Sequence, residues 1–154
     1  MRNVTLCLLL REGEVCLGMK KRGFGEGKWN GFGGKVAESE SIEAAAIREL
    51  AEETGVSARQ EHLERIGEID FHFLDKPEWD QRMHVFTIRR WEGEPTESEE
   101  MLPRWYTHEG IPYDDMWIDD SHWLPHALAG KKLKAEFAFN KEGVELARHS
   151  LTFL

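Results

Sequence analysis

The stretch of sequence that decides the fold reads GKVAESESIEAAAIRELAEETGV, from Gly34 to Val56. Its small, helix-favouring residues predict a helix over Ser41–Thr54. We expect Ser39 or Ser41 to be the N-cap, because a hydroxyl side chain can accept a hydrogen bond from the first turn. Gly55 is expected to end the helix, since glycine adopts the left-handed conformation found at helix ends.

Three carboxylates lie close together on this predicted helix. At about 100° per residue, Glu49, Glu52 and Glu53 fall within one third of the helix circumference. They continue the apolar side of the same helix, which consists of Ile42, Ala45 and Ala46. We expect that side to pack on a sheet. A solvated acidic stripe would also fit the pattern. However, like charges at this spacing repel, and the helix dipole disfavours anions at a C-terminus. The pattern therefore favours a metal site, and oxygen ligands suit Mg²⁺ or Mn²⁺.

Arg48 precedes the carboxylates and points to another sector of the helix. A guanidinium cannot ligate a metal, but it can hold a neighbouring carboxylate through two parallel hydrogen bonds. The alternative is an ordinary surface arginine.

A glycine-rich loop precedes the helix, over Lys20–Lys35. It carries five lysine or arginine residues against Glu26 alone, opposite in sign to the whole chain. Glycine allows close backbone approach to a ligand, so the loop suits a phosphate site beside the carboxylates. The alternative is a flexible surface loop. Against it, the loop contains three aromatic side chains that we expect to pack on another surface: Phe24, Trp29 and Phe32.

The remaining segments predict an α/β fold with a mixed sheet and helices packed against it. A second helix is expected from Asp119-Asp120-Ser121 to about Ala129, and an acidic loop over 93–100. Trp105–Tyr106 is expected to be a short strand. The other expected strands are Val4–Leu10, Val15–Met19, Leu63–Leu74, Met83–Trp91, Leu133–Phe139 and Val144–Phe153, with Asp75–Asp80 as a separator.

The 154 residues predict one domain over 1–154. The net charge of −9 argues against nonspecific binding of polymeric DNA or RNA. The first apolar run, Val4–Leu10, is too short to span a membrane. Cys7 and Cys16 are too few for a disulfide framework, and we expect both to be buried free thiols. A cytoplasmic monomer is the expectation.

The spacing of Gly34, Glu40 and Arg48-Glu49-Leu50-Ala51-Glu52-Glu53-Thr54-Gly55-Val56 resembles the Nudix box at every fixed position. The box consists of a glycine, five residues, a glutamate, seven residues, and Arg-Glu-apolar-x-Glu-Glu-x-Gly-apolar. The resemblance implies an α/β/α sandwich with a mixed sheet, the box forming a strand-loop-helix-loop. It also implies hydrolysis of nucleoside diphosphate derivatives with a divalent metal.

Further stretches outside the box are specific: Gly18-Met19-Lys20-Lys21-Arg22-Gly23-Phe24-Gly25, Trp29-Asn30-Gly31-Phe32-Gly33-Gly34-Lys35, and Met116-Trp117 with Asp119-Asp120-Ser121 and Trp123. They resemble the oxidised purine nucleoside triphosphatase branch of that family, and the similarity covers nearly the whole chain. The resemblance implies base recognition by Asn30, Asp119 and Asp120, with the base stacked on Trp117. The residues alone favour a different role for Asp119 and Asp120, which is to cap the second helix together with Ser121. Two adjacent carboxyl groups can also share a proton, so that one donates and one accepts along a purine edge. Other positions that match the pocket of the branch are Thr5, Lys20, Phe24, Phe71, Phe73 and Trp123.

Three positions depart from the pattern of the branch: Gln81 in a strand that lines the pocket, Ile118 in place of proline, and His72 in place of an acid. They affect the expected base preference but not the expected pyrophosphatase chemistry. We expect Gln81 to contact the substrate.

The resemblance implies attack by metal-activated water at a phosphoanhydride, releasing a nucleoside monophosphate and pyrophosphate. It assigns Glu49, Glu52 and Glu53 to the metal, together with the Gly34 carbonyl. Glu53 or Glu52 would accept the proton of the water. Glu100 matches a further ligand or base, or is an ordinary loop acid. Lys20 would contact phosphate. Alternatives are a pyrophosphatase for ADP-ribose or a dinucleoside polyphosphate, and a noncatalytic nucleotide-binding module.

Overall fold

An eight-stranded mixed sheet runs through the computed structural model, which describes all residues from Met1 to Leu154. Its strands are β1 (Arg2–Arg11), β2 (Glu14–Lys20), β3 (Trp29–Asn30), β4 (Leu63–Phe73), β5 (Gln81–Ile88), β6 (Met101–Thr107), β7 (Leu133–Asn140) and β8 (Glu145–Phe153). They are ordered β3-β2-β1-β5-β4-β7-β8, and β6 pairs with β2 outside this path. The pairs β1–β5 and β4–β7 are parallel, and the others are antiparallel.

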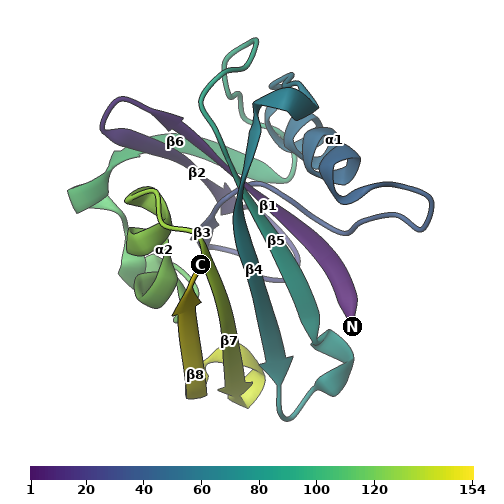
Figure 1. Ribbon diagram of the computed structural model, residues 1–154, viewed down its shortest axis with the longest axis vertical. Helices are drawn as coiled ribbons and strands as arrows, with labels where there is room; N and C mark the ends of the chain where they lie inside the picture. The colour runs from purple at the N-terminus through teal and green to yellow at the C-terminus, as the bar shows by residue number, and fades with distance from the viewer.

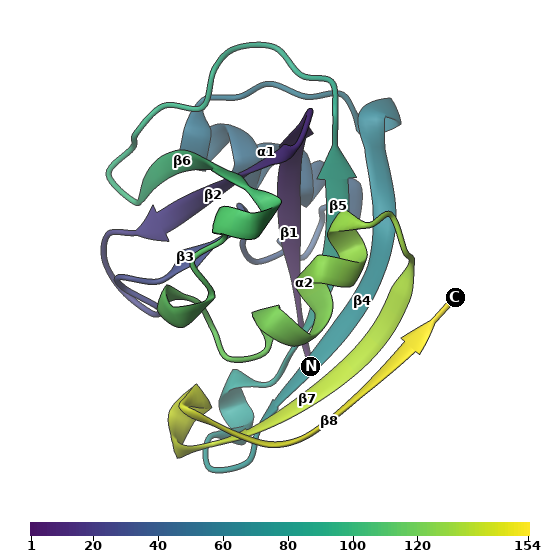
Figure 2. The same ribbon diagram turned by 90° about the vertical axis from the view of Figure 1, so that its left-hand side faces the viewer.

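Two helices lie on opposite faces of the sheet, α1 (Ile42–Thr54) and α2 (Asp120–Leu128) (Figures 1 and 2). Short 3-10 turns complete the structure: η1 (Gln60–His62), η2 (Pro77–Trp79), η3 (His108–Gly110), η4 (Tyr113–Asp115) and η5 (Lys141–Gly143). This arrangement is the expected α/β/α sandwich. Neither helix has the length and apolar character needed to cross a membrane.

The unbroken apolar run of β1 is explained by burial on both of its faces. Leu6 and Leu8 belong to the larger core cluster, which includes residues of α2. Cys7 and Leu9 point the other way, into a cluster with Ala46 and Leu50 of α1. The central strand therefore joins the two cores, and both cysteines lie buried as free thiols.

Helix α1 begins and ends as predicted. Ser41, rather than Ser39, is the N-cap, and its hydroxyl accepts a hydrogen bond from the amide of Ala44 at 3.1 Å. Gly55 ends the helix in the left-handed conformation at φ 77°. Because the caps fix both ends, the carboxylates in the last turns have defined positions relative to the sheet.

Four predictions about strands need correction. The strand expected at Trp105–Tyr106 spans all of β6, because it pairs with β2 along its whole length. The strand expected at Met83–Trp91 is β5, which starts earlier through pairing with β1 and ends before Trp91. The glycine-rich loop contains the short strand β3. The last strand begins at Glu145, because η5 occupies the residues before it.

Candidate active site

A cavity of about 810 Å³ opens between the end of α1, the glycine-rich loop, the strands β1, β4 and β5, and the start of α2. It gathers residues that are far apart in the sequence. Almost all of the predicted site residues line it: Thr5, Lys20, Phe24, Asn30, Gly34, Glu49, Glu52, Glu53, Phe71, Phe73, Gln81, Glu100, Trp117, Asp119 and Asp120.

Glu53 is the most deeply buried carboxylate of α1, with 7% of its surface exposed. Its Oε1 accepts a hydrogen bond from the amide of Gly33 at 2.9 Å, which ties the helix to the glycine-rich loop. Burial, and to a smaller extent the negative charges of Glu49 and Glu100, raise the pKa of Glu53 to about 8. The Gly33 amide and the charge of Lys20 act in the opposite direction. A buried carboxylate of this kind is more stable as an anion when a cation lies beside it.

Glu49 lies directly against the backbone of Gly34. A Cβ added at Gly34 would stand 2.5 Å from the carboxylate carbon of Glu49, closer than atoms can approach. The glycine therefore leaves the space that this carboxylate occupies. The Gly34 carbonyl accepts hydrogen bonds from Thr5, at 2.9 Å from its amide and at 3.5 Å from its hydroxyl.

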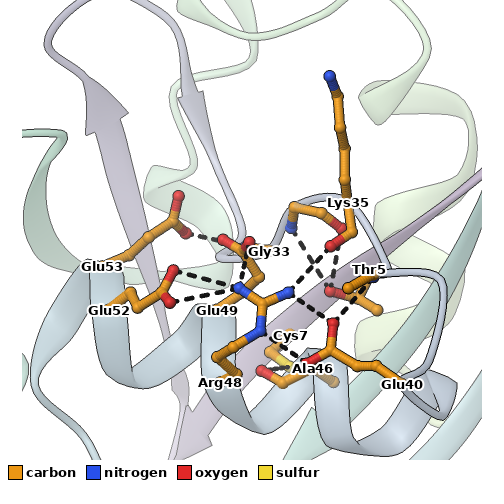
Figure 3. Close-up of polar contacts among 12 residues, drawn as sticks. Thr5, Cys7, Gly33, Lys35, Glu40, Ala46, Arg48, Glu49, Glu52 and Glu53 are labelled. Atoms are coloured by element: carbon orange, nitrogen blue, oxygen red, sulfur yellow. Dashed lines mark hydrogen bonds and ion pairs between the residues drawn. The ribbon is translucent and has the colours of Figure 1, made fainter.

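Arg48 holds carboxylates on both of its sides, as Figure 3 shows. Its Nε and Nη2 donate to the two oxygens of Glu40, each at 2.7 Å, in the predicted bidentate pair. Its Nη1 donates to Glu49 at 2.9 Å and to Glu52 at 3.3 Å. The hydrogen bonds from Arg48 lower the pKa of Glu40 to about 2. Arg48 does not line the cavity, so it orients the carboxylates from behind.

The donors at this end suit a divalent cation, although no group of three or more acidic, His or Cys side chains is arranged to hold one as they lie. Arg48 engages Glu49 and Glu52 in this conformation. The set consists entirely of oxygen atoms, from the carboxylates of α1 and the Gly34 carbonyl, which is the chemistry that Mg²⁺ and Mn²⁺ prefer. The close approach of the Glu49 carboxylate to the Gly34 backbone and the raised pKa of Glu53 both fit a cation here.

Glu100 lines the cavity, but its carboxylate is held by Arg22. Its Oε1 accepts from Nε and Nη2 of Arg22 at 3.0 and 2.8 Å, and these bonds lower the pKa of Glu100. The amide of Lys21 also donates to the backbone carbonyl of Glu100 at 2.8 Å. The acidic loop is thus attached to the glycine-rich loop, a long-range contact that sequence spacing could not indicate.

At the other end of the cavity lie Asp119 and Asp120, each 3% exposed. Neither side chain caps α2, so the capping interpretation is wrong for both residues. Asp119 instead accepts a hydrogen bond from the indole of Trp123 at 2.9 Å. Oδ2 of Asp120 is the one buried side-chain oxygen or nitrogen in the chain that has no hydrogen-bond partner. Burial raises the pKa of both carboxyl groups, and the charge of Asp119 raises that of Asp120 further.

Trp123 was expected to line the pocket, and this prediction is wrong. It is almost fully buried and absent from the cavity wall, since its indole packs behind Asp119. Of the three departures, Gln81 lines the cavity, whereas Ile118 is exposed and His72 pairs with Asp80 outside it.

Several cavity residues were not assigned a site role from the sequence. Trp79 lies in the segment treated as a separator, and it contacts Phe24 and Phe73 edge-on. Four basic residues line the cavity wall without forming an ion pair: Arg2, Lys20, Lys28 and Lys35. Of these, only Lys20 was assigned a site role from the sequence. The excess of lysine in the glycine-rich loop was the available signal for Lys28 and Lys35.

Three comparisons with known proteins, by family model, by sequence and by structure, agree with one another. The NUDIX domain model matches residues 1–127. The chain is 48% identical over 146 residues to the oxidized purine nucleoside triphosphate hydrolase of Mus musculus, covering 95% of this chain and 92% of that protein. It is 47% identical over 148 residues to the protein of the same name from Danio rerio, with 96% and 92% covered. The crystal structure of a MutT protein from Bacillus halodurans superposes with a TM-score of 0.83 at 25% identity, covering 98% and 97% of the chains.

Proposed function

The chain belongs to the NUDIX family, and from this premise we propose that it is a pyrophosphohydrolase of oxidised or otherwise modified purine nucleoside triphosphates, such as 8-oxo-dGTP and 2-hydroxy-dATP. The products are a nucleoside monophosphate and pyrophosphate, so the protein removes damaged nucleotides from the pool. Its similarity to the two oxidized purine nucleoside triphosphate hydrolases supports this substrate class. Nudix hydrolases generally use a divalent metal, for which we propose Mg²⁺, with Mn²⁺ as a substitute.

The observation that carries the proposal is the unpartnered Oδ2 of Asp120 in a cavity that also presents Asp119 and Trp117. A buried polar atom without a partner is costly, and a ligand edge that pairs with it removes the cost. Burial and the charge of Asp119 raise the pKa of Asp120, which favours the protonated carboxyl form that can donate a hydrogen bond. Oxidation and methylation change the donors and acceptors of a purine edge, which a proton-sharing pair can accommodate.

The carboxylate end provides the place for the triphosphate. Glu49, Glu52 and Glu53 would hold the metal with the Gly34 carbonyl, and Glu100 would join after release from Arg22. When bound, a divalent ion neutralises phosphate charge and lowers the pKa of water. Lys20 binds phosphate, and the substrate spans the cavity from this end to the aspartate pair. Arg48 orients Glu49 and Glu52 through its hydrogen bonds.

We assign Glu53, rather than Glu52, the role of accepting the proton of the attacking water. Glu53 is buried at the cavity wall, whereas the side chain of Glu52 is exposed and bound to Arg48. General base catalysis contributes roughly 100-fold to 10,000-fold in rate. We expect Glu53→Gln to lower kcat by at least about 100-fold and Glu52→Gln by less. A larger loss in Glu52→Gln would reverse the assignment.

Pyrophosphate release with Mg²⁺ tests the function over a panel: 8-oxo-dGTP, 2-hydroxy-dATP, N6-methyl-dATP, dGTP, dATP and ADP-ribose. We expect kcat/KM for the modified purine triphosphates to exceed that for dGTP and dATP by tenfold or more, about 1.4 kcal/mol. Asp119→Asn should change this preference. Turnover of ADP-ribose alone, or of no nucleotide, would contradict the proposal.

We also propose that the protein acts as a monomer in the cytoplasm. The free thiols Cys7 and Cys16 fit a reducing compartment. Light scattering of the purified protein at working concentration tests the monomer, and a dimer mass would contradict it.

A further inference from the structure

Trp79 belongs to η2, in the connection between β4 and β5. Contacts made by neighbouring residues of this turn fix the position of its ring. The amide of Trp79 donates to the carbonyl of Lys76 at 2.9 Å. Asp80, the next residue, accepts a hydrogen bond from the amide of Phe73 at 2.8 Å. The ammonium group of Lys76 lies 5.4 Å from the centre of the Trp79 ring. The half-buried indole therefore has a defined place at the cavity wall rather than a free position on a loop.

From that place, Trp79 contacts the aromatic side chains of the cavity edge-on. Its ring centre lies 5.0 Å from that of Phe24, at 71°, and 5.6 Å from that of Phe73, at 79°. Phe24 in turn lies 5.1 Å from Trp117, tilted by 31°. Four rings from four separate segments thus form one continuous aromatic wall, and edge-to-face pairs of this kind are attractive beyond simple burial.

Phe24 depends on these rings for its position. It is 54% exposed, and it is flanked by Gly23 and Gly25 in the glycine-rich loop, which restrict the backbone little. Its aromatic contacts are with Phe73, Trp79 and Trp117, and the closest of the three is with Trp79. Removal of the Trp79 ring would leave one side of Phe24 without support at the mouth of the cavity.

We infer that Trp79 is a positioning residue for purine recognition, which fixes Phe24 against Trp117 and so shapes the end of the cavity that holds the base. This inference rests on the proposed function, because it takes that end as the purine site. Trp79 acts on the base end and is not part of the carboxylate group. Its loss should therefore weaken binding and leave the chemical step almost unchanged.

Binding of 8-oxo-dGMP and steady-state hydrolysis of 8-oxo-dGTP test the inference. We expect Trp79→Ala to raise Kd and KM by about tenfold and to change kcat by less than about threefold. Trp79→Phe keeps a ring edge and should restore both values to within about threefold of wild type. Trp91→Ala is the matched control: this half-buried tryptophan stacks on Trp105 outside the cavity, so its loss should leave Kd unchanged.

A double-mutant cycle with Phe24→Ala separates positioning from direct contact. If Trp79 acts through Phe24, Trp79→Ala should add less than about threefold to Kd in the Phe24→Ala background. A full tenfold effect in that background would overturn the inference, as would unchanged binding by Trp79→Ala or a loss confined to kcat. If Trp79→Ala does not fold, Trp79→Leu gives the same test, and an unchanged Kd overturns the inference. Wild-type protein that neither binds 8-oxo-dGMP nor hydrolyses modified triphosphates would contradict the proposed function itself.

Discussion

Asp119 and Asp120 are adjacent in sequence and both buried, which makes them costly to ionise. Burial penalises the charged form of each carboxyl group, and ionisation of one opposes ionisation of the other. The Trp123 indole donates to Asp119 and favours its anion. The two residues therefore have different environments, with the proton favoured on Asp120. A pair of this kind presents one donor and one acceptor to a ligand, and its fixed geometry comes from packing around α2.

Asp120→Asn should flatten the pH dependence of stability. A carboxyl group whose pKa is raised in the folded state keeps its proton while the unfolded chain loses it above about pH 4. The free energy of unfolding of the wild type should therefore fall as pH rises from about 4 through the raised pKa values. The asparagine cannot ionise, and it removes the negative charge that opposes ionisation of Asp119. The free energy of unfolding should therefore fall less with pH in the variant. Urea unfolding at a series of pH values measures this, and parallel curves would contradict it.

Gly34→Ala should impair the site more than the fold. The added Cβ would meet the end of the Glu49 side chain at 2.5 Å, which can move away at little cost in stability. We expect a loss of about 1 kcal/mol or less in the free energy of unfolding, with a large fall in Mg²⁺ affinity and kcat. Gly33→Ala is the matched comparison, because its Cβ would stand 1.7 Å from the backbone carbonyl oxygen of Thr5 and should destabilise the fold. Equal destabilisation of both variants, measured by urea unfolding, would contradict this account.

At the scale of elements, the turn between β7 and β8 supports the aromatic wall. Lys141, Glu142 and Gly143 all have positive φ, at 50°, 55° and 96°. Asp75 stabilises the turn by accepting a hydrogen bond from the amide of Glu142 at 3.1 Å. The conformation brings Gly143 against Trp117, where a Cβ would lie 2.6 Å from the indole ring. A turn that looks like a simple connection in the sequence thus packs against Trp117, the residue proposed to stack on the base.

Gly143→Ala should raise KM for purine triphosphates, because it displaces Trp117. Gly130→Ala is the control, since Gly130 also has a positive φ, at 84°, but a Cβ there would meet nothing within 4 Å. Both substitutions should cost about 1 kcal/mol of stability from backbone strain. Only Gly143→Ala should add a clash, and with it a larger loss of stability and a KM change of several-fold. Unfolding and steady-state kinetics of the two variants, compared side by side, check this. Equal KM values would show that Gly143 does not position Trp117.

At the scale of the whole molecule, the cavity is lined by both basic and acidic side chains, which suits the binding of a phosphate chain together with a metal ion. The protein has a net charge of −9, yet Arg2, Lys20, Lys28 and Lys35 line the cavity without ion pairs. Glu49, Glu52 and Glu53 face the same space. Burial, together with the charges of Glu49 and Glu100, raises the pKa of Glu53 to about 8, so a cation in this space would favour its anion.

Mg²⁺ should therefore raise the melting temperature of the wild-type protein. An ion that binds only the folded state stabilises it by RT ln(1 + [L]/Kd), about 2.7 kcal/mol at 100 times Kd. The effect should disappear with EDTA and be reduced in Glu53→Gln, which lacks one carboxylate. Differential scanning fluorimetry measures the shift, and KCl at equal ionic strength controls for simple screening of the negative charge. An equal shift in Glu53→Gln would argue against Glu53 as a ligand.

Much of the carboxylate end of the site could be predicted from sequence, because its geometry is local. Residues at i, i+3 and i+4 share a helix face whatever surrounds the helix, so Glu49, Glu52 and Glu53 were placed together correctly. The end at Gly55 follows from the same local chemistry, as does a serine N-cap, although only the structure selected Ser41 over Ser39. The bidentate partner of Arg48 is Glu40, which precedes the helix, and the sequence left this pairing open against a surface arginine. The purine end was assigned by family resemblance, and its residues come from both halves of the chain.

The sequence by itself determined α1, its end at Gly55 and its carboxylate face, since backbone hydrogen bonds between near neighbours fix these features. Only the tertiary structure decided how distant segments meet. It extended β6 through pairing with β2, attached Glu100 to Arg22, placed Trp123 behind Asp119, and brought Trp79 against Phe24. The physical reason is that strand pairing and side-chain packing act between residues whose separation along the chain carries no information about their distance in space.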